Sequence, residues 1–255
     1  MSVTGSDSNG VGTYIGYDTN STSSVTVTDV GVGNNLRYYP STLNVNNGAL
    51  VVGYNGNGTL TVANGGLASI TGDDDTGTGA TGFGLYIGKN ANSTGNVTVT
   101  GLEPNSEYET LLDVTNGTMA VGYYGNGTLM ISSGGEVNVT GNDTNGIGAY
   151  IGYDANSTSS VTVTDVGVDI YSDYFRSSLN VSDGALVVGY NGNGTLNVAN
   201  GGSVSVSGDD ATGIGETGFG LYLGENANST GTVTVSGIES VNTSVMVTEL
   251  VELAS

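Results

Sequence analysis

Short runs in which apolar and polar residues alternate recur along the whole chain. In a typical run, Thr59-Leu60-Thr61-Val62, every second side chain is apolar. Such alternation is typical of a β-strand with one buried face, and the strand-favouring residues Val, Thr, Ile and Tyr dominate these runs. Clusters of Gly and Asn separate the runs, and both residues accept the positive φ angles of tight turns. The pattern predicts an all-β protein.

The pattern of strands and turns is itself repeated. Tyr14 to Val32 returns as Tyr150 to Val168 with a single change, from Thr19 to Ala155. We call this spacing the long repeat, and it divides the chain into units of about 136 residues. The first unit covers about 12–147, and the second, incomplete unit covers about 148–255.

Recurring glycines divide these units into seven quasi-repeats of roughly 30 to 37 residues. Each quasi-repeat holds two short strand patterns separated by Gly/Asn turns, which indicates a rung of roughly 17–18 residues. A rung of this size cannot bury its apolar residues alone, whereas stacked rungs can bury them in one continuous column. The sequence predicts a single β-solenoid (parallel β-helix) over residues 1–255. A pair of β-sandwich domains, one per long unit, is the alternative, but it explains the internal repeats less economically.

Composition excludes several classes of function. The 255 residues include 24 Asp and Glu against 3 Lys and Arg, which gives a net charge of −21, and there is no His and no Cys. Ser-His-Asp or Cys-His catalysis and zinc sites built from His or Cys are therefore excluded. Because the charge repels phosphates, we expect no nucleic-acid partner, and no apolar run is long enough for a membrane span. The acidic residues recur in every repeat, whereas an active site would break the symmetry, so we expect no enzymatic activity.

Acidic turns at equivalent places, such as Ser6 to Gly10 and Asn142 to Gly146, each precede a predicted strand. Their Asp-x-Asn-Gly pattern partly resembles a calcium loop. The candidate calcium ligands are Asp7, Asn9, Asp74, Asp75, Asp143, Asn145, Asp209 and Asp210. The loops lack the bidentate Glu of an EF-hand, so solvated turns are the alternative, and no other cofactor is expected.

Two insertions and the C-terminal stretch are candidate contact surfaces. The insertions, one around Arg37 and one around Arg176, carry paired aromatic residues beside a basic residue, which is typical of contact surfaces. Local packing of the aromatic rings is the alternative. The stretch 245–255 is unusually apolar and is expected to form a cap or a strand-addition tail. The candidate interface residues are Arg37, Tyr38, Tyr39, Tyr174, Phe175, Arg176, Val245, Val247 and Leu250.

The Thr-rich strands are similar to the Thr arrays of ice-binding solenoids. Such a surface needs pairs of Thr on every rung, and strands that carry Met130 or Asn197 interrupt the array. The sequence therefore does not favour ice binding.

The repeats also resemble those of a known class of proteins. The motif IGxxxNSTGxVTVxG (Ile87 to Gly101) alternates with LxVxxGxxxVGYxGNGTLxxxxGG (Leu43 to Gly66). This alternation resembles the repeats of type V secretion (autotransporter) passengers and of PEP-CTERM-associated surface proteins, over nearly the whole chain. The resemblance implies a β-solenoid that is extracellular or displayed at the cell surface.

We therefore expect an extracellular structural protein, a rigid acidic β-solenoid subunit that assembles with copies of itself into a filament, fibre or surface layer. The alternative is a stalk or passenger segment of a cell-surface adhesin, whose glycan or protein ligand the sequence does not identify.

Overall fold

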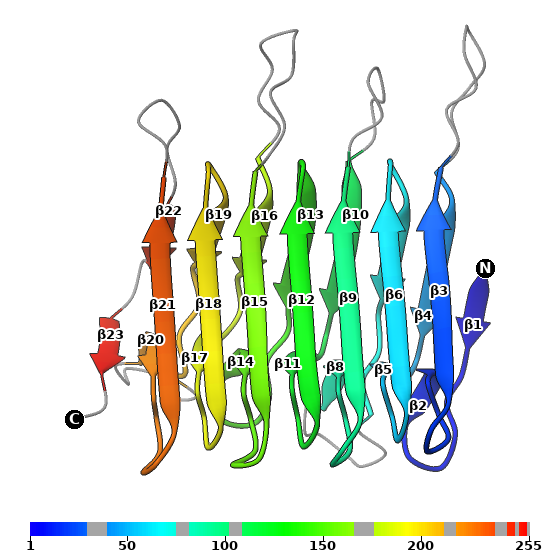
Figure 1. The fold of residues 1–255 in the computed structure, drawn as a ribbon, viewed down its shortest axis with the longest axis horizontal. Coiled ribbons are helices and arrows are strands. Elements are labelled where there is room, and N and C mark those ends of the chain that lie inside the picture. Colours follow the sequence, from blue (N-terminus) through cyan, green and yellow to red (C-terminus); the bar gives the residue numbers. More distant parts are fainter. Residues whose placement is uncertain are drawn as a thin grey trace, which may run out of the picture.

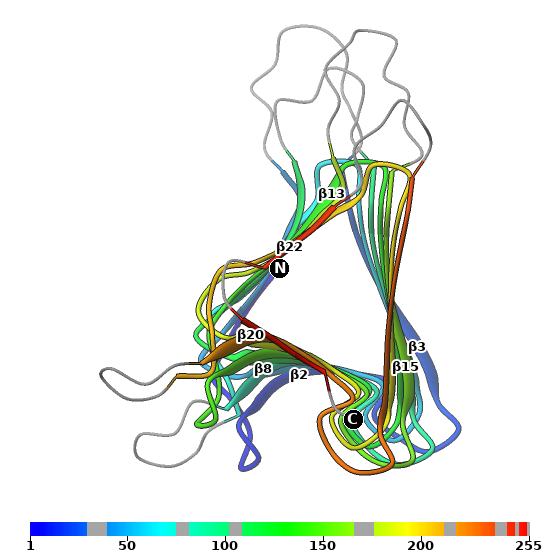
Figure 2. The same ribbon diagram turned by 90° about the vertical axis from the view of Figure 1, so that its left-hand side faces the viewer.

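The computed structural model has the form of a tube with three flat sides (Figures 1 and 2). It describes residues 1–29, 40–74, 82–101, 109–165, 176–211, 218–237, 244–247 and 250–253. Each side of the tube is a parallel β-sheet, and the described residues contain no helix that is long and apolar enough to cross a membrane. The all-β parallel solenoid predicted from the sequence is confirmed.

Within the described residues, the three sheets contain eight, eight and seven strands. Sheet A consists of β1 (Ser2–Thr4), β4 (Thr42–Asn46), β7 (Leu67–Ile70), β10 (Thr110–Thr115), β13 (Gly135–Thr140), β16 (Ser178–Val181), β19 (Ser203–Val206) and β22 (Ser244–Val247). Sheet B consists of β2 (Val11–Ile15), β5 (Ala49–Val52), β8 (Phe83–Ile87), β11 (Thr118–Val121), β14 (Ile147–Ile151), β17 (Ala185–Val188), β20 (Phe219–Leu223) and β23 (Leu250–Leu253). Sheet C consists of β3 (Thr22–Thr28), β6 (Asn57–Ala63), β9 (Thr94–Thr100), β12 (Asn126–Ser132), β15 (Thr158–Thr164), β18 (Asn193–Ala199) and β21 (Thr230–Ser236).

One strand from each sheet makes one turn of the solenoid. The register of sheet B aligns Tyr14 with Val51, Val51 with Tyr86 and Ala120 with Tyr150, so each quasi-repeat is one turn. A turn therefore closes after two of the predicted rungs rather than after one, because it holds three strands and their connections. The recurring glycines each follow the sheet B strand with φ between 67° and 80°: Gly16, Gly53, Gly88, Gly122, Gly152, Gly189 and Gly224.

The apolar side chains of all three sheets meet inside the tube. In sheet C, Leu60, Leu129 and Leu196 have no exposed surface and alternate with outward residues that are polar except for Met130. Because the strands pair in parallel and in register, each apolar side chain lies over an equivalent one in the next turn. The inward residues form one continuous hydrophobic cluster along the described turns.

Hydrogen bonds between successive turns close the corner where sheet B leads into sheet C. The N–H of Gly189 donates to the carbonyl oxygen of Ile151 at 2.8 Å, and Gly194 packs directly against this bond. A Cβ atom on Gly194 would lie 2.1 Å from that oxygen. Gly58, Gly95, Gly127 and Gly231 occupy the same position in other turns. In these five turns glycine allows the close approach of two backbones, whereas Ser23 and Ser159 occupy the same register position in the other two.

Candidate functional site: acidic loops over an aromatic surface

The outer face of sheet B is also buried, unlike that of a sheet with one solvated face. Its central outward column alternates large and small side chains: Tyr14, Val51, Tyr86, Ala120, Tyr150, Val187 and Tyr222. Neighbouring strands lie only about 4.8 Å apart, so Val and Ala on alternate turns leave room for the rings. Tyr86 and Tyr150 are only 3% and 1% exposed as a result.

A second aromatic row lies beside this column, at the residue that follows the turn glycine. The rings of Tyr123 and Tyr153 stack with centroids 4.5 Å apart, and those of Tyr153 and Tyr190 stack at 5.0 Å. Tyr150 makes edge contacts with both Tyr153 and Tyr190. In the third turn Lys89 takes this position, with its Nζ 3.9 Å from the ring centroid of Tyr86. We call the two rows together the aromatic ladder.

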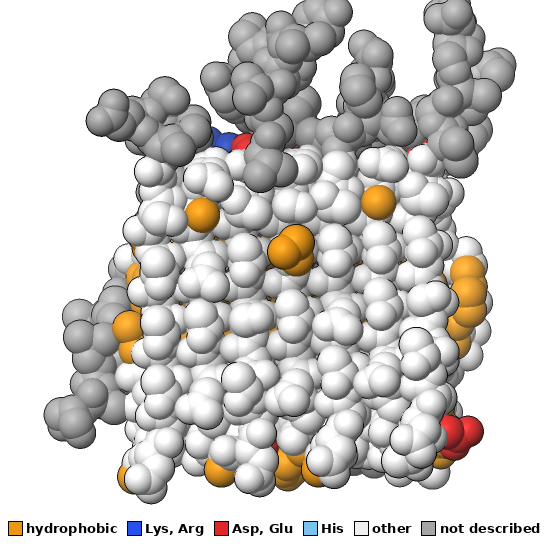
Figure 3. Space-filling model, viewed as in Figure 1, with side chains coloured by type: hydrophobic (Ala, Val, Ile, Leu, Met, Phe, Trp, Pro, Cys, Tyr) orange, Lys and Arg blue, Asp and Glu red, His pale blue; other side chains and the backbone are white. Residues whose placement is uncertain are grey.

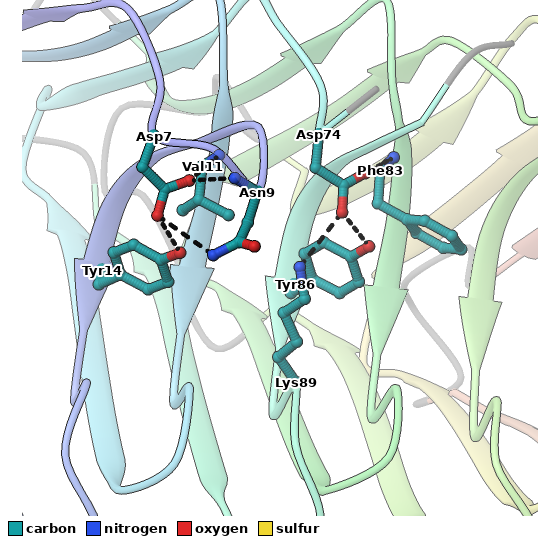
Figure 4. Close-up of polar contacts among 8 residues, drawn as sticks. All are labelled: Asp7, Asn9, Val11, Tyr14, Asp74, Phe83, Tyr86 and Lys89. Carbon is teal, nitrogen blue, oxygen red and sulfur yellow. Dashed lines mark hydrogen bonds and ion pairs between the residues drawn. The ribbon is translucent and has the colours of Figure 1, made fainter. Parts of the chain in front are cut away.

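Two of the acidic loops hold the tyrosines through a single carboxylate each. Oδ1 of Asp7 accepts hydrogen bonds from the N–H groups of Asn9 at 2.8 Å and Val11 at 3.1 Å. Its Oδ2 accepts from the hydroxyl of Tyr14 at 2.8 Å (Figure 4). Asp143 repeats this arrangement, with its Oδ2 2.7 Å from the hydroxyl of Tyr150. A turn closed by an Asp side chain thus positions the acceptor for a buried phenol.

The other two loops use the same chemistry with a longer connection. Oδ1 of Asp74 accepts from the N–H of Phe83 at 2.9 Å, and its Oδ2 accepts from the hydroxyl of Tyr86 at 2.5 Å. The Nζ of Lys89 lies 3.2 Å from the same oxygen (Figure 4). Asp210 likewise accepts from the N–H of Phe219 and the hydroxyl of Tyr222. In each of the four loops, one carboxylate therefore accepts a hydrogen bond from one tyrosine of the aromatic ladder.

The contact between Asp7 and Tyr14 shifts the pKa values of both partners. Burial, followed by the hydrogen bond to Asp7, raises the pKa of Tyr14 to about 12. Burial and the charges of Asp74 and Asp143 raise the pKa values of Tyr86 and Tyr150 further. Burial alone would raise the pKa of Asp7, but the hydrogen bonds from Tyr14, Val11 and Asn9 together outweigh it, so its pKa is lowered. The phenols are neutral donors and the Asp7 carboxylate is a charged acceptor at neutral pH.

The structure places most of the predicted calcium ligands in these loops. The loops lie in pairs, because Gly10 packs against the backbone of Asp74 and Gly146 against that of Asp210. Asn9 and Asn145 donate hydrogen bonds to their own loop Asp, and Asp209 accepts from the N–H of Ala211. Asp75 lies outside the described residues. Within the described ranges, no group of three or more acidic side chains could hold a metal ion, and calcium binding stays a prediction.

The predicted interface residues divide into two groups. Arg37, Tyr38, Tyr39, Tyr174 and Phe175 lie outside the described residues, whereas Arg176 is exposed just before β16. The C-terminal stretch forms the outermost strands of two sheets: Val245 and Val247 in β22 pack half-buried against the core, and Leu250 begins β23.

The sequence reasoning missed the tyrosine partners of the acidic loops. Asp7 precedes Tyr14 by the same interval as Asp143 precedes Tyr150, and the longer interval from Asp74 to Tyr86 also recurs between Asp210 and Tyr222. These two repeated intervals were the signal that could have linked each carboxylate to its phenol.

Comparison with known proteins identifies no relative. No protein-family model, curated protein or solved structure matches the chain. The function must therefore be inferred from the residues and their geometry.

The loops are expected to stabilise the fold through their carboxylates. Replacing Asp143 with alanine removes the acceptor of the Asn145 and Ile147 amides and of the buried Tyr150 hydroxyl. We expect a loss of about 2–4 kcal/mol in the free energy of unfolding, because a buried donor loses its partner. Asp154 is the matched control, since among the described residues its carboxylate accepts hydrogen bonds only from Asn156. Asp154→Ala should cost less than about 1 kcal/mol. Equal losses in urea unfolding would contradict the prediction.

Proposed function

We propose that this chain is a non-enzymatic extracellular structural protein, a rigid acidic β-solenoid subunit that joins end to end with copies of itself into a filament, fibre or surface layer. The proposal is supported by the way in which each turn binds the next. Three sheets and one continuous core repeat from turn to turn, so the contact needed for growth is one that the chain already makes internally. The resemblance of the repeats to secreted and surface-displayed proteins favours the extracellular location.

The observation that carries this proposal is the match between the two ends of the solenoid. By the long repeat, which relates Tyr14 to Tyr150, β1 and β2 are the equivalents of β13 and β14. At the other end, β22 and β23 occupy the positions of β10 and β11, because they pair with β19 and β20, the repeats of β7 and β8.

Inside the chain, β10 pairs with β13, and β11 pairs with β14. A second copy can therefore place its β1 and β2 beside β22 and β23 in a pairing that has an internal precedent. Among the described strands, sheet C has one fewer than each of the other two sheets, so this contact would be made by sheets A and B. Strand addition of this kind uses main-chain hydrogen bonds at an open sheet edge.

Charge controls when such subunits can meet. Each chain carries a net charge of −21, so two rods repel one another at low ionic strength. Salt screens this repulsion over distances of about 10 Å at 0.1 M. We therefore expect assembly to strengthen as the salt concentration rises, or when divalent cations bridge carboxylates.

Removing the outermost strands should abolish assembly. Deletion of Val245–Ser255 removes the edges of sheets A and B, and electron microscopy should then show single rods where the intact chain forms filaments of uniform width. A point variant tests the same edge with less disturbance. The N–H of Ser244 donates toward β19, so the N–H of Val245 points to the outer edge, and Val245→Pro removes that donor.

Val245→Thr is the matched control, because it keeps the N–H group. Filaments of unchanged length from both the deletion and Val245→Pro would overturn end-to-end assembly through this edge. Single rods from the intact chain at all salt concentrations would instead favour a stalk segment of an adhesin.

A further inference from the structure

Sheet C presents an outer face without charge on a strongly acidic protein. None of its seven strands contains an Asp, Glu, Lys or Arg, although the chain carries a net charge of −21. The outward side chains are Thr, Ser and Asn, apart from Ala63, Met130 and Ala199. Figure 3 shows this face as an even polar surface with few apolar side chains.

The described carboxylates on the other two sides contrast with this face. Asp7, Asp74, Asp143 and Asp210 lie in the loops over sheet B, and the outer face of sheet A carries acidic residues in β10 and β13. Two rods that met through either of these sides would bring carboxylates together, at a Coulombic cost. Two rods that met through sheet C would not.

The one large apolar side chain that the described strands place on this face lies near its centre. Met130 belongs to β12, the middle strand of the seven, and is 43% exposed. Thr98 and Thr162 flank it in register on the neighbouring strands. An apolar centre with a polar rim is the common anatomy of a protein interface, and Met is enriched in such centres.

The face also has the area of a specific interface. Seven strands spaced about 4.8 Å apart, each seven residues long at about 3.3 Å per residue, cover about 800 Å². A pair of such faces would bury about 1,500 Å² in total, which is the size of a standard protein–protein interface.

We propose that the outer face of sheet C binds the same face of a second copy, in a two-fold symmetric pair centred on Met130. The proposal rests on the proposed function for the identity of the partner, but the side-by-side contact does not need the ends of the rod. In a two-fold pair a residue near the axis meets its own counterpart, so the two Met130 side chains would pack together. Assembly could then proceed in two directions, along the rod and across it.

A cysteine scan tests the contact directly, because the chain has no cysteine of its own. Under mild oxidation by a copper–phenanthroline complex, Met130→Cys should form a covalent dimer on a non-reducing gel, since a disulfide needs Cβ atoms about 4 Å apart. Thr140→Cys, on the outer face of sheet A, is the control and should stay monomeric. No dimer from Met130→Cys, or equal dimer from both variants, would overturn the proposal.

Charge insertion gives a second, reversible measurement. Thr162→Glu puts two carboxylates beside the proposed axis and should raise the dissociation constant at least about tenfold in sedimentation equilibrium at about 0.15 M NaCl. Thr140→Glu adds the same charge to sheet A and should change that constant by less than about twofold. Equal effects of the two variants would contradict a contact through sheet C.

Met130→Thr separates a second copy from other occupants of the face. Loss of the apolar centre should weaken the pair, whereas an unchanged or tighter pair would refute a contact centred on Met130. A chain that stays monomeric but binds ice or a neutral polysaccharide more strongly after Met130→Thr would overturn the proposal in favour of those ligands. If the Met130→Cys chain forms the covalent dimer but no filaments, the side-by-side contact stands and only end-to-end assembly is rejected.

Discussion

Replacing Gly194 with alanine is expected to lower the free energy of unfolding by about 1–3 kcal/mol. The added Cβ would lie 2.1 Å from the carbonyl oxygen of Ile151 and 2.5 Å from the nitrogen of Gly189. Both atoms belong to backbone and form a hydrogen bond to one another. The substitution therefore has to shift the backbone at this corner, because no flexible side chain can move aside.

Ser159 supplies the matched control. It occupies the equivalent register position in the preceding turn, where the chain already accommodates a Cβ atom, and its Oγ accepts a hydrogen bond from the N–H of Gly127 at 3.2 Å. Ser159→Ala adds no atom at the corner and should cost only about 1 kcal/mol for the lost hydrogen bond. Thermal unfolding measures both variants, and hydrogen exchange of the Gly189 amide should quicken only in Gly194→Ala. Equal stability of the two variants would refute a steric requirement for glycine at position 194.

Raising the pH above about 10 is expected to unfold the solenoid. Tyrosines of the unfolded chain ionise near their ordinary pKa of 10.0, whereas the pKa values of Tyr86 and Tyr150 are raised by burial and by the nearby Asp74 and Asp143 charges. The folded state therefore holds the phenolic protons more tightly. This stabilisation is fully present below about pH 10 and is lost as the pH rises toward the raised values.

The size of the loss follows from linkage. Each buried tyrosine costs about 1.4 kcal/mol of stability per pH unit above about pH 10. Tyr86 and Tyr150 together should therefore cost about 5 kcal/mol by about pH 12, which is a large part of the stability of an ordinary domain.

The test is to follow tyrosinate absorbance and circular dichroism in one alkaline titration. The two signals should change together, because the buried phenols ionise only when the fold opens. A Tyr150→Phe variant removes one of the two groups and should unfold at a higher pH than its stability at neutral pH would indicate. Ionisation of all tyrosines near about pH 10 with intact circular dichroism would contradict the prediction.

Most of the architecture could be predicted from the sequence. Alternating strands, glycine turns and the long repeat indicated a β-solenoid, and the seven recurring glycines each mark one turn. The number of residues in one turn was harder to predict. Sequence spacing shows where the chain bends, but it does not show how many bends bring the chain back over its starting strand. The structure shows that each turn also contains a strand of sheet A, which forms the third side of the solenoid.

The roles of individual residues were harder to predict. Gly53 and Gly58 look alike in the segment Gly53 to Gly58, yet Gly53 has a φ of 78° and Gly58 is needed for close approach to a neighbouring turn. The acidic turns looked like solvated or ion-binding loops. Their contacts with tyrosines depend on loops that fold back over sheet B, and the repeated Asp–Tyr intervals are the sequence signal of these contacts.

The repeat of four turns has an evolutionary consequence. The step from β2 to β14 in sheet B spans four turns and coincides with the long repeat that relates Tyr14 to Tyr150. Unequal recombination between the two nearly identical copies in a gene would therefore insert or remove whole sets of turns. Each event would change the length of the rod by about 19 Å. Every new junction would use a strand pairing that the protein already contains. Length could vary between strains or generations without a new interface having to evolve.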